Sequence, residues 1–183
     1  MVIFSFVITW KAGRSHPNKA ALLWSIGCSV MAFFGAGVWG FLHTLSSVNY
    51  YSHGARVTAA HGHLAFFGAY VMLNLAIMAY ATPEIRGCQP YNQWLSITSF
   101  WAMCTAMSVM TFPLTFAGVV QTHLQCVMGI NYMEVQDQFA LIYWMRLGSG
   151  VVVVISALMF TWAVLVPGKE RRDSLTSMVQ PAE

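Results

Sequence analysis

Charged side chains are scarce in this sequence. Only 8% of its 183 residues are Asp, Glu, Lys or Arg, whereas 57% are hydrophobic. A soluble domain usually carries about a quarter charged residues, so this deficit argues for an integral membrane protein. The net charge of +3 is small and its basic residues cluster between apolar runs. That distribution indicates membrane topology rather than nucleic-acid binding.

The cysteines lack any pairing pattern. The four of them show no CxxC spacing, which predicts neither a disulfide framework nor a zinc site: Cys28, Cys88, Cys104 and Cys126. Two of them, Cys28 and Cys104, fall inside apolar runs, where cysteine behaves as a small hydrophobic residue. The first ten residues lack a basic segment and no small-residue cleavage site follows them, so no cleavable signal peptide is expected.

Long apolar runs dominate what is present. A helix needs about 20 apolar residues to cross the hydrocarbon core of a bilayer. Four runs meet this length, at residues 20–45, 57–81, 93–120 and 139–166. Pro83 is expected to stop the second run, and Pro113 to kink the third. A shorter run at residues 1–10 is expected to be the end of a helix whose beginning is missing.

These runs predict an all-α fold, a polytopic transmembrane helix bundle with four full spans plus a truncated N-terminal one. Residues 1–166 are expected to form one transmembrane domain, and residues 167–183 a charged cytoplasmic tail. Residues 46–56 are expected to form a polar loop, and residues 121–138 a longer amphipathic connection.

The most informative feature is a pair of histidines two residues apart within an apolar span. His61 and His63 stand in the run TAAHGHLAFFGAY, residues 58–70. Each residue of an α-helix turns by about 100°, so a two-residue step directs the two imidazoles about 200° apart, onto opposite faces. A chelating pair on one face requires a spacing of three or four residues. The pair therefore predicts two separate metal centres, one on each flank of a single helix.

Haem iron suits such ligands. When two histidines occupy both axial positions of the iron, the haem can only transfer electrons. When one histidine is bound, the other axial position stays open for substrate. Imidazole is costly in a lipid-buried helix and tends to mark function. Histidines that merely form hydrogen bonds between helices stay open as the alternative. His43 and Thr44 end the first span. The sequence does not decide whether they face an active-site cavity or lie at the membrane interface. The expected loop histidines are His16 and His123.

The connecting segments alternate in charge, which predicts the orientation. One side carries the basic set Lys11, Arg14, Lys19, Arg86, Lys169, Arg171 and Arg172, and the other carries Arg56, Glu134 and Asp137. By the positive-inside rule the first side is cytoplasmic, together with the C-terminus. The histidine pair follows the exterior segment 46–56 by five to seven residues, so both metal centres are expected near the outer side of the membrane.

Three segments closely resemble the catalytic cytochrome b subunit of bacterial nitric oxide reductases, a family within the haem–copper oxidase superfamily. They are GAGVWGFLHT (35–44), NYYSHG (49–54) and TAAHGH (58–63). Shorter matches are GAY (68–70), PEIRG (83–87) and QDQ (136–138), with Tyr143, Trp144 and Arg146. The resemblance runs to about Leu165 and covers only the last part of a subunit of roughly twelve helices.

The resemblance implies a role for each histidine of the pair. His61 matches the axial ligand of the high-spin haem b3, and His63 matches one of two axial ligands of the low-spin haem b. Among the polar residues near the exterior, His53, Arg56 and Arg146 are candidates to pair with haem propionates, since donor groups stabilise carboxylates at a membrane surface. Solvated positions stay open for these three residues.

The resemblance also implies an activity, the coupling of two NO molecules to N2O in the inner membrane of bacteria. Electrons would come from a membrane-anchored cytochrome c subunit or from quinol. The family's non-haem iron ligands lie on earlier helices that this chain lacks, so the isolated chain is expected to be inactive without those N-terminal helices. Two alternatives stay open, a fragment of an oxygen-reducing haem–copper oxidase and a non-catalytic membrane protein.

Overall fold

A computed structural model describes residues 11, 18–87 and 92–166. This part of the chain is helical and contains no strand. Four helical runs are long and apolar enough to cross a membrane: Lys19–Thr44, Arg56–Ile85, Gln93–Val127 and Ala140–Leu165. The predicted class and the four full spans are confirmed. The predicted short span at 1–10 and the tail at 167–183 lie outside the described residues.

Each of the first three runs contains a π-helical stretch. The first run is α2 (Lys19–Ala32), η1 (Phe33–Trp39) and α3 (Gly40–Thr44); the second is α5 (Arg56–Phe66), η2 (Phe67–Val71) and α6 (Met72–Ile85). The third run joins α7 (Gln93–Thr122) to η3 (His123–Val127), and the fourth is α9 (Ala140–Leu165). Single π turns inside α-helices often occur at functional sites. Here η1 and η2 flank the histidine pair.

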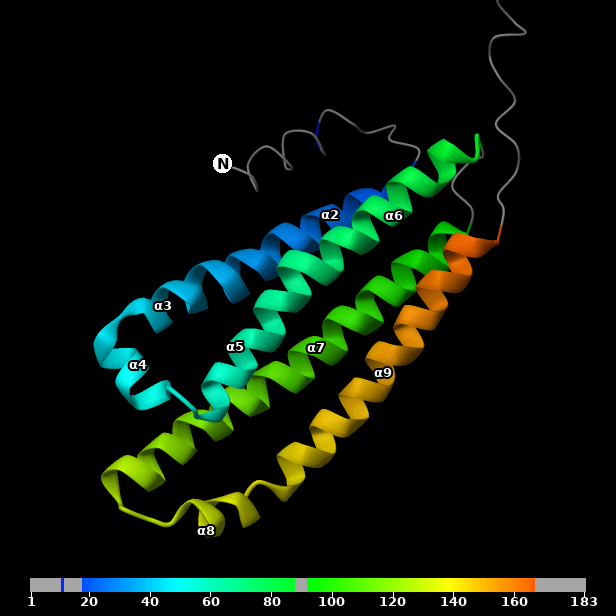
Figure 1. Cartoon of the computed structure of the whole chain (residues 1–183). Helices are drawn as coiled ribbons and strands as arrows, with labels where there is room; N and C mark the ends of the chain where they lie inside the picture. Colours follow the sequence, from blue (N-terminus) through cyan, green and yellow to red (C-terminus); the bar gives the residue numbers. More distant parts are fainter. Residues whose placement is uncertain (1–10, 12–17, 88–91, 167–183) are drawn as a thin grey trace, which may run out of the picture.

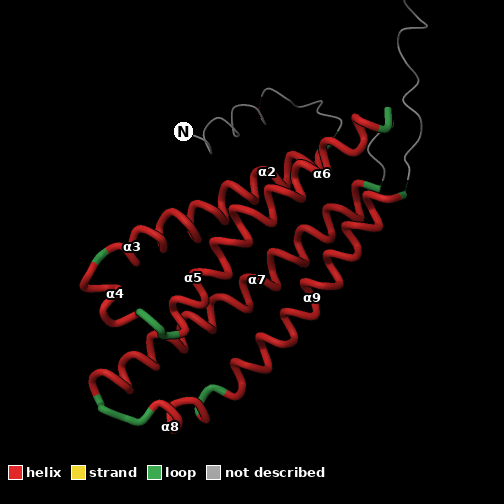
Figure 2. Tube along the Cα trace, in the orientation of Figure 1, coloured by secondary structure: helices red, strands yellow, loops and turns green. Residues whose placement is uncertain are grey.

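The four runs lie side by side with alternating direction (Figure 1). The run α5–α6 packs on α2 and η1, α7 packs on α5, and α9 packs on α7. One end of the bundle carries the short helices α4 (Ser46–Ser52) and α8 (Tyr132–Asp137), with the loops around them (Figure 2). We call this the α4/α8 end. The opposite end carries the start of α2, so we call it the Asn18 end.

The predicted loop at 46–56 is largely wrong. Residues Ser46–Ser52 form α4, and Arg56 is the first residue of α5. Backbone bonds explain the helix, since the Asn49 amide donates to the carbonyl of Leu45 at 2.9 Å and the His53 amide donates to that of Asn49 at 2.8 Å. Polar composition suggested a loop, but a helix satisfies these backbone groups near a membrane surface. The connection at 121–138 is also shorter than expected, because the α7 helix continues through η3 to Val127.

Pro83 does not stop its helix, which continues to Ile85. A proline lacks the amide that would bond the carbonyl four residues earlier, here that of Ala79. The side-chain amide of Asn18 donates to this carbonyl oxygen instead, at 2.7 Å. Asn18 is also the N-cap of α2, where its Oδ1 accepts from the Ala21 amide at 3.0 Å. One asparagine therefore satisfies backbone groups of two helices. Pro113 likewise lies within a continuous helix, α7.

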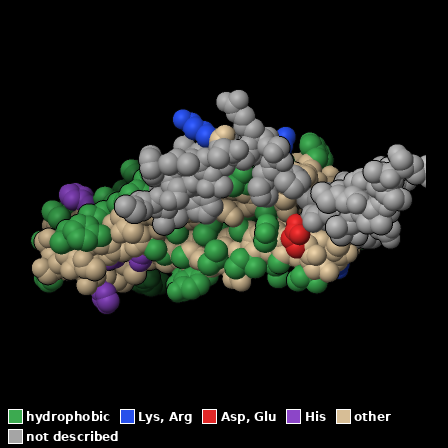
Figure 3. Space-filling view, turned by 90° about the horizontal axis from the view of Figure 1, so that it is seen from above, with side chains coloured by type: hydrophobic (Ala, Val, Ile, Leu, Met, Phe, Trp, Pro, Cys, Tyr) green, Lys and Arg blue, Asp and Glu red, His purple; other side chains and the backbone are tan. Residues whose placement is uncertain are grey.

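The packed core lies in the half of the bundle toward the Asn18 end. Trp24 is fully buried and makes edge-to-face contacts with Phe100 and Phe160, with ring centroids 5.1 and 5.3 Å apart. Its indole N–H donates to the Ser96 hydroxyl at 3.2 Å. Outward faces remain apolar, since many large hydrophobic side chains of the four runs are exposed, and patches of them are visible in Figure 3. A surface of this kind suits lipid or further helices rather than water.

The double role of Asn18 generates a prediction for stability. Asn18→Ala removes the bond to the Ala79 carbonyl, worth about 1 kcal/mol, and the cap, worth about 1 kcal/mol. In a Pro83→Ala background the backbone amide is restored and bonds that carbonyl itself, so Asn18→Ala is expected to cost only the cap. A double-mutant cycle on unfolding free energy in detergent measures the difference. Equal costs in both backgrounds would refute the compensation.

Candidate functional site

His61 and His63 lie near the start of α5, toward the α4/α8 end, and they face different neighbours. His61 lies against the first run, where its Nδ1 contacts η1 and its ring stacks on a histidine of α3. His63 lines pockets formed with α7 and α9. The helix therefore presents one imidazole to each flank, as the two-residue spacing predicted. The histidine side chains visible in Figure 3 lie toward the end that carries α3 and α4.

The His61 ring is held by two contacts. Its Nδ1 lies 3.0 Å from the carbonyl oxygen of Gly35, and its plane stacks on the His43 ring with centroids 4.8 Å apart at 21°. The tautomer that satisfies the carbonyl carries its hydrogen on Nδ1, which leaves the lone pair of Nε2 available. Metal-ligating histidines are commonly oriented in this way by a backbone carbonyl.

His43 belongs to the same cluster. Its Nδ1 lies 2.8 Å from the Trp39 carbonyl oxygen, and its Nε2 is buried with no hydrogen-bond partner among the described residues. Of the two positions left open by the sequence, packing of the half-buried His43 ring on His61 favours a place beside the site. Thr44 is exposed and its hydroxyl donates to the Phe41 carbonyl at 2.7 Å, so Thr44 lies at the helix end instead.

Close contact between helices fixes the carbonyl that orients His61. A Cβ atom added at Gly35 would lie 2.7 Å from backbone atoms of Leu64 and Ala65. Reciprocally, a Cβ added at Gly68 would lie 2.5 Å from the Ala32 amide nitrogen. Only glycine permits backbones to approach this closely, which is how small residues pack membrane helices. The approach of η1 to α5 therefore depends on Gly35, and the approach of α2 to η2 depends on Gly68.

The His63 ring is oriented from within its own helix, and its Nδ1 lies 2.6 Å from the Ala59 carbonyl oxygen. Again the hydrogen of Nδ1 is committed to a carbonyl and Nε2 stays available. Two adjoining pockets of about 640 and 610 Å³ share His63, Met110 and Gly150 in their walls. Volumes of this size accommodate organic cofactors.

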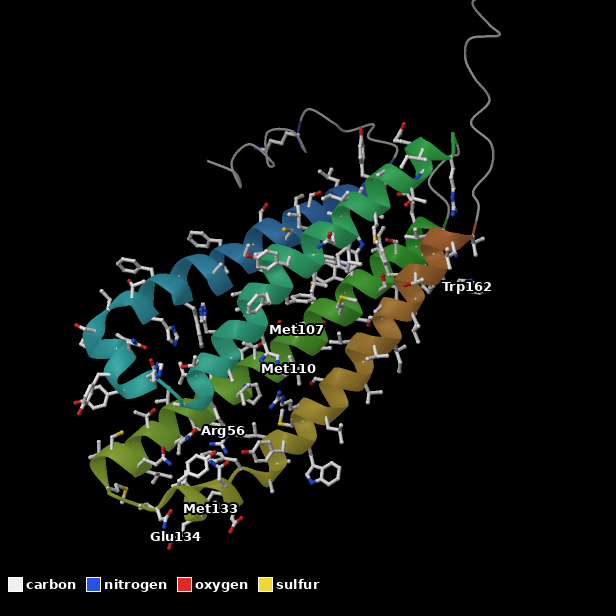
Figure 4. All side chains as sticks on the ribbon, viewed as in Figure 1. Arg56, Met107, Met110, Met133, Glu134 and Trp162 are labelled. Carbon is white, nitrogen blue, oxygen red and sulfur yellow. The ribbon has the colours of Figure 1, made fainter. Side chains whose placement is uncertain are left out.

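The walls of these pockets are apolar with one cationic group. Met107 and Met110 line them from α7, near the middle of that helix in Figure 4, and Val153 and Val154 line them from α9. Methionine packs adaptably against flat aromatic groups. Arg146 also lines the larger pocket, together with Tyr143. The combination of apolar walls, one imidazole and one guanidinium suits a haem with an anionic edge.

The single imidazole on each flank of α5 fits the ligation of a haem better than the binding of a metal ion by protein side chains alone. In residues 18–87 and 92–166 no group of three or more His, Cys, Asp or Glu side chains is close enough to hold a metal ion. Each ring of the pair instead offers one oriented Nε2, which is what axial ligation of a macrocycle requires.

Arg56 is the first residue of α5 and ties that helix to α7, α8 and α9 at the α4/α8 end. Its guanidinium donates to the side-chain oxygen of Gln121 at 2.8 Å, and to Gln136 and the Tyr143 hydroxyl. It also stands 4.5 Å over the Phe139 ring. We call these five side chains the Arg56 cluster. Figure 4 shows Arg56 between α7 and the segment that contains α8.

The other predicted site residues do not belong to the Arg56 cluster. His53 is exposed just after α4, and His123 is exposed at the start of η3. Arg146 is exposed on α9 but shares the larger pocket with His63. The structure thus brings Arg146 to the His63 flank and leaves His53 at the surface.

Sequence reasoning missed two contributions to the site. The sequence did not single out Met107 and Met110, although their three-residue spacing places them on one face of a helix. Gln121 was placed in a connection, yet it is a buried residue of α7 that accepts twice from Arg56. Its signal, a polar side chain at the end of an apolar run, is too common to identify a partner 65 residues away.

The glycine contact generates a prediction with a matched control. Gly35→Ala places a methyl group 2.7 Å from the backbone of α5, so the helices must separate and the unfolding free energy is expected to fall by about 1–3 kcal/mol. Gly37→Ala lies in the same π-helical stretch, but its nearest contact is 3.7 Å, so it is expected to be neutral or to stabilise by up to about 1 kcal/mol. Thermal unfolding in detergent compares them. Equal midpoints for the two variants would contradict this account.

Comparison with known proteins agrees with the site. The family model described as Cytochrome C and Quinol oxidase polypeptide I matches residues 1–152. A curated relative, the B subunit of nitric oxide reductase from Stutzerimonas stutzeri, is 43% identical over 177 residues, which cover 92% of this chain. The chain spans 37% of the length of that relative. With its histidine-bearing helix and bundle of apolar spans, this chain belongs to the cytochrome c and quinol oxidase polypeptide I family.

Proposed function

We propose that this chain forms part of a membrane nitric oxide reductase, in which His61 and His63 hold two different haems. The overall reaction converts two NO molecules, two electrons and two protons to N2O and water. The observation that carries the proposal is the opposed, carbonyl-oriented pair of imidazoles on α5. The relative from Stutzerimonas stutzeri, named as a nitric oxide reductase, supplies the choice of substrate, because 43% identity extends over nearly the whole chain.

The low-spin haem b is assigned to His63. The pockets beside this residue support the assignment, since their methionine and valine walls suit the faces of a macrocycle. His63 would donate one axial nitrogen, and the second would come from a helix of the complete enzyme outside this chain. A closed low-spin centre transfers electrons without binding substrate.

The high-spin haem b3 is assigned to His61. His61 would hold this haem through Nε2, and the bound haem would supply an iron able to take NO. The role of this chain is to hold His61 through the Gly35 carbonyl and the stacked His43 ring. The non-haem iron of the complete enzyme would take its ligands from other helices.

Arg146, Arg56 and His53 are proposed to stabilise haem propionates. Arg146 has the best support, because it lines the pocket of His63. Arg56 is connected to that pocket through Tyr143, although its hydrogen bonds go to neutral side chains. His53 is exposed at the same end of the bundle.

Charge supports an orientation in the bacterial inner membrane. Lys19 and Arg86 lie at the Asn18 end, where Arg86 donates to carbonyls of Val164 and Leu165 at the end of α9. The acidic residues Glu134 and Asp137 lie at the α4/α8 end. By the positive-inside rule the Asn18 end and the C-terminus are cytoplasmic. Fusions of a reporter protein to the C-terminus test this, and a periplasmic signal would overturn it.

The family also includes oxygen-reducing oxidases. The histidine pair of this chain fits such an oxidase as well as a nitric oxide reductase. The choice depends on residues outside this chain, where a glutamate beside three histidines favours iron and NO. Gas consumption by the purified complete enzyme discriminates between the two. Production of N2O from NO supports our proposal, whereas reduction of O2 with no activity on NO would replace it.

Substitution of each histidine tests the assignment of haems. In the complete subunit, His61→Ala is expected to remove the high-spin haem signal and to leave the low-spin signal. His63→Ala is expected to do the reverse, because the two rings serve opposite flanks. Optical and electron paramagnetic resonance spectra measure both, with the exposed His123→Ala as a control that changes neither. Identical losses in both variants would argue against separate haems.

The electron donor is proposed to approach the α4/α8 end. Side chains of α8 there combine exposed apolar surface with acidic charge, as Met133 is 68% exposed beside Glu134 (Figure 4). A membrane-anchored cytochrome c subunit with a basic rim around an apolar patch would fit this surface.

Met133→Ser is expected to slow haem reduction by the donor several-fold while haem spectra stay unchanged, since buried apolar anchors dominate protein interfaces. Trp162→Ser is the control. Trp162 is similarly exposed (66%), but it lies near the end of α9 that is far from α8. Stopped-flow spectroscopy measures the rates. If Met133→Ser leaves the rate unchanged, the donor docks elsewhere.

A further inference from the structure

Arg56 is a buried cation with no anionic partner in the described chain. Only 9% of its surface is exposed. All of its hydrogen bonds go to neutral groups, the side-chain oxygens of Gln121 and Gln136 and the hydroxyl of Tyr143. No carboxylate of residues 18–87 or 92–166 pairs with it, and Glu134 and Asp137 on α8 are exposed. Burial of an uncompensated charge is costly, so its retention points to a use for the charge.

The position of Arg56 relates it to His63. Seven residues separate them on α5, which is close to two full turns, so both side chains leave the same face about 10 Å apart along the axis. Tyr143 connects them further, because its hydroxyl bonds Arg56 and its side chain lines the pocket that His63 also lines. His61, by contrast, points to the opposite flank.

The cluster also fixes where the charge lies. Gln121 accepts from both the backbone amide and the guanidinium of Arg56, at 3.3 and 2.8 Å. A Cβ added at Gly118, one turn earlier on α7, would lie 2.2 Å from the Val57 amide nitrogen, so α7 contacts the start of α5 directly. Rings of Phe139 and Tyr143 cover the guanidinium at 4.5 and 5.2 Å. The positive charge is therefore held at one place and shielded from solvent.

We propose that Arg56 is a fixed charge, not neutralised by any carboxylate of the described chain, that raises the reduction potential of the haem bound by His63. This rests on the proposed function of His63. Ferric haem carries one more positive charge than ferrous haem, so a nearby cation disfavours the oxidised form. Reduction adds one electron from the donor, and no bond is formed or broken. A higher potential favours electron entry from that donor.

The expected size follows from Coulomb's law. Two unit charges about 10–12 Å apart, with an effective dielectric constant of about 20, change an equilibrium by about tenfold. For a one-electron couple, tenfold in the ratio of reduced to oxidised haem corresponds to about 59 mV. Because the charge is buried, salt screens this effect much less than it screens surface charges.

The test is a redox titration of the complete subunit followed at the low-spin haem band. Arg56→Gln is expected to lower the midpoint potential of that haem by about 59 mV, whereas Arg56→Lys keeps the charge and is expected to retain the potential. Gln121→Glu is a second variant that preserves the cluster and adds a carboxylate within bonding distance of Arg56. It is expected to lower the potential as well, even if Arg56→Gln fails to fold.

Arg86→Gln is the matched control. It removes the same charge from the opposite end of the bundle, where Arg86 bonds the end of α9, and it is expected to leave the potential unchanged. An unchanged potential in both Arg56→Gln and Gln121→Glu, with an intact low-spin spectrum, would overturn the role of Arg56. Absence of a low-spin haem signal from wild type, or its persistence in His63→Ala, would instead overturn the assignment of His63.

Discussion

The structure depends on one geometric constraint, the two-residue step between His61 and His63 on a continuous helix. That step directs the two rings to opposite flanks, so α5 must be packed on both sides while each Nε2 stays free. Other features of the site follow from this need. The glycines at positions 35 and 68 bring the first run against one flank, and α7 and α9 line open pockets on the other. The helix thus serves as a shared wall between two different environments.

Those environments differ in ways that suit two centres with different tasks. His61 is oriented by a carbonyl from another helical run and stacks on a second imidazole, which restrains its ring. His63 is oriented by a carbonyl of its own helix and opens onto two apolar pockets of about 640 and 610 Å³. A fixed cation lies on the His63 face only, two turns away. On the proposed assignment, this difference would let electron transfer and substrate chemistry be tuned separately although the two histidines are two residues apart.

Much of this account was predictable from the sequence, because membrane insertion imposes strong local signals. Span lengths, the opposed histidines and the end of the bundle that carries them all follow from apolar runs and helical periodicity. The family also followed from segments around residues 35–63. The polar segment 46–56 was predicted wrongly, because a polar composition near the interface does not distinguish a loop from a short helix such as α4.

The remaining features arise from contacts between distant residues. Pro83 was expected to end its helix, but Asn18 satisfies the carbonyl that proline leaves free, and 61 residues separate Asn18 from that carbonyl. The Arg56 cluster likewise joins three segments up to 87 residues apart. No local pattern encodes such partners. The same reason explains why the sequence left His43 ambiguous, since its place is decided by the stacking of its ring on that of His61.

The central claim is that one helix ligates two haems, one on each flank. Determination of the complete subunit's structure by electron cryomicroscopy tests it most directly, since a haem is visible at ordinary resolution. We predict one macrocycle against Nε2 of His61 on the flank of η1 and α3, and another against Nε2 of His63 on the flank of α7 and α9. A single macrocycle on one flank, or rings that contact only other helices, would contradict the account.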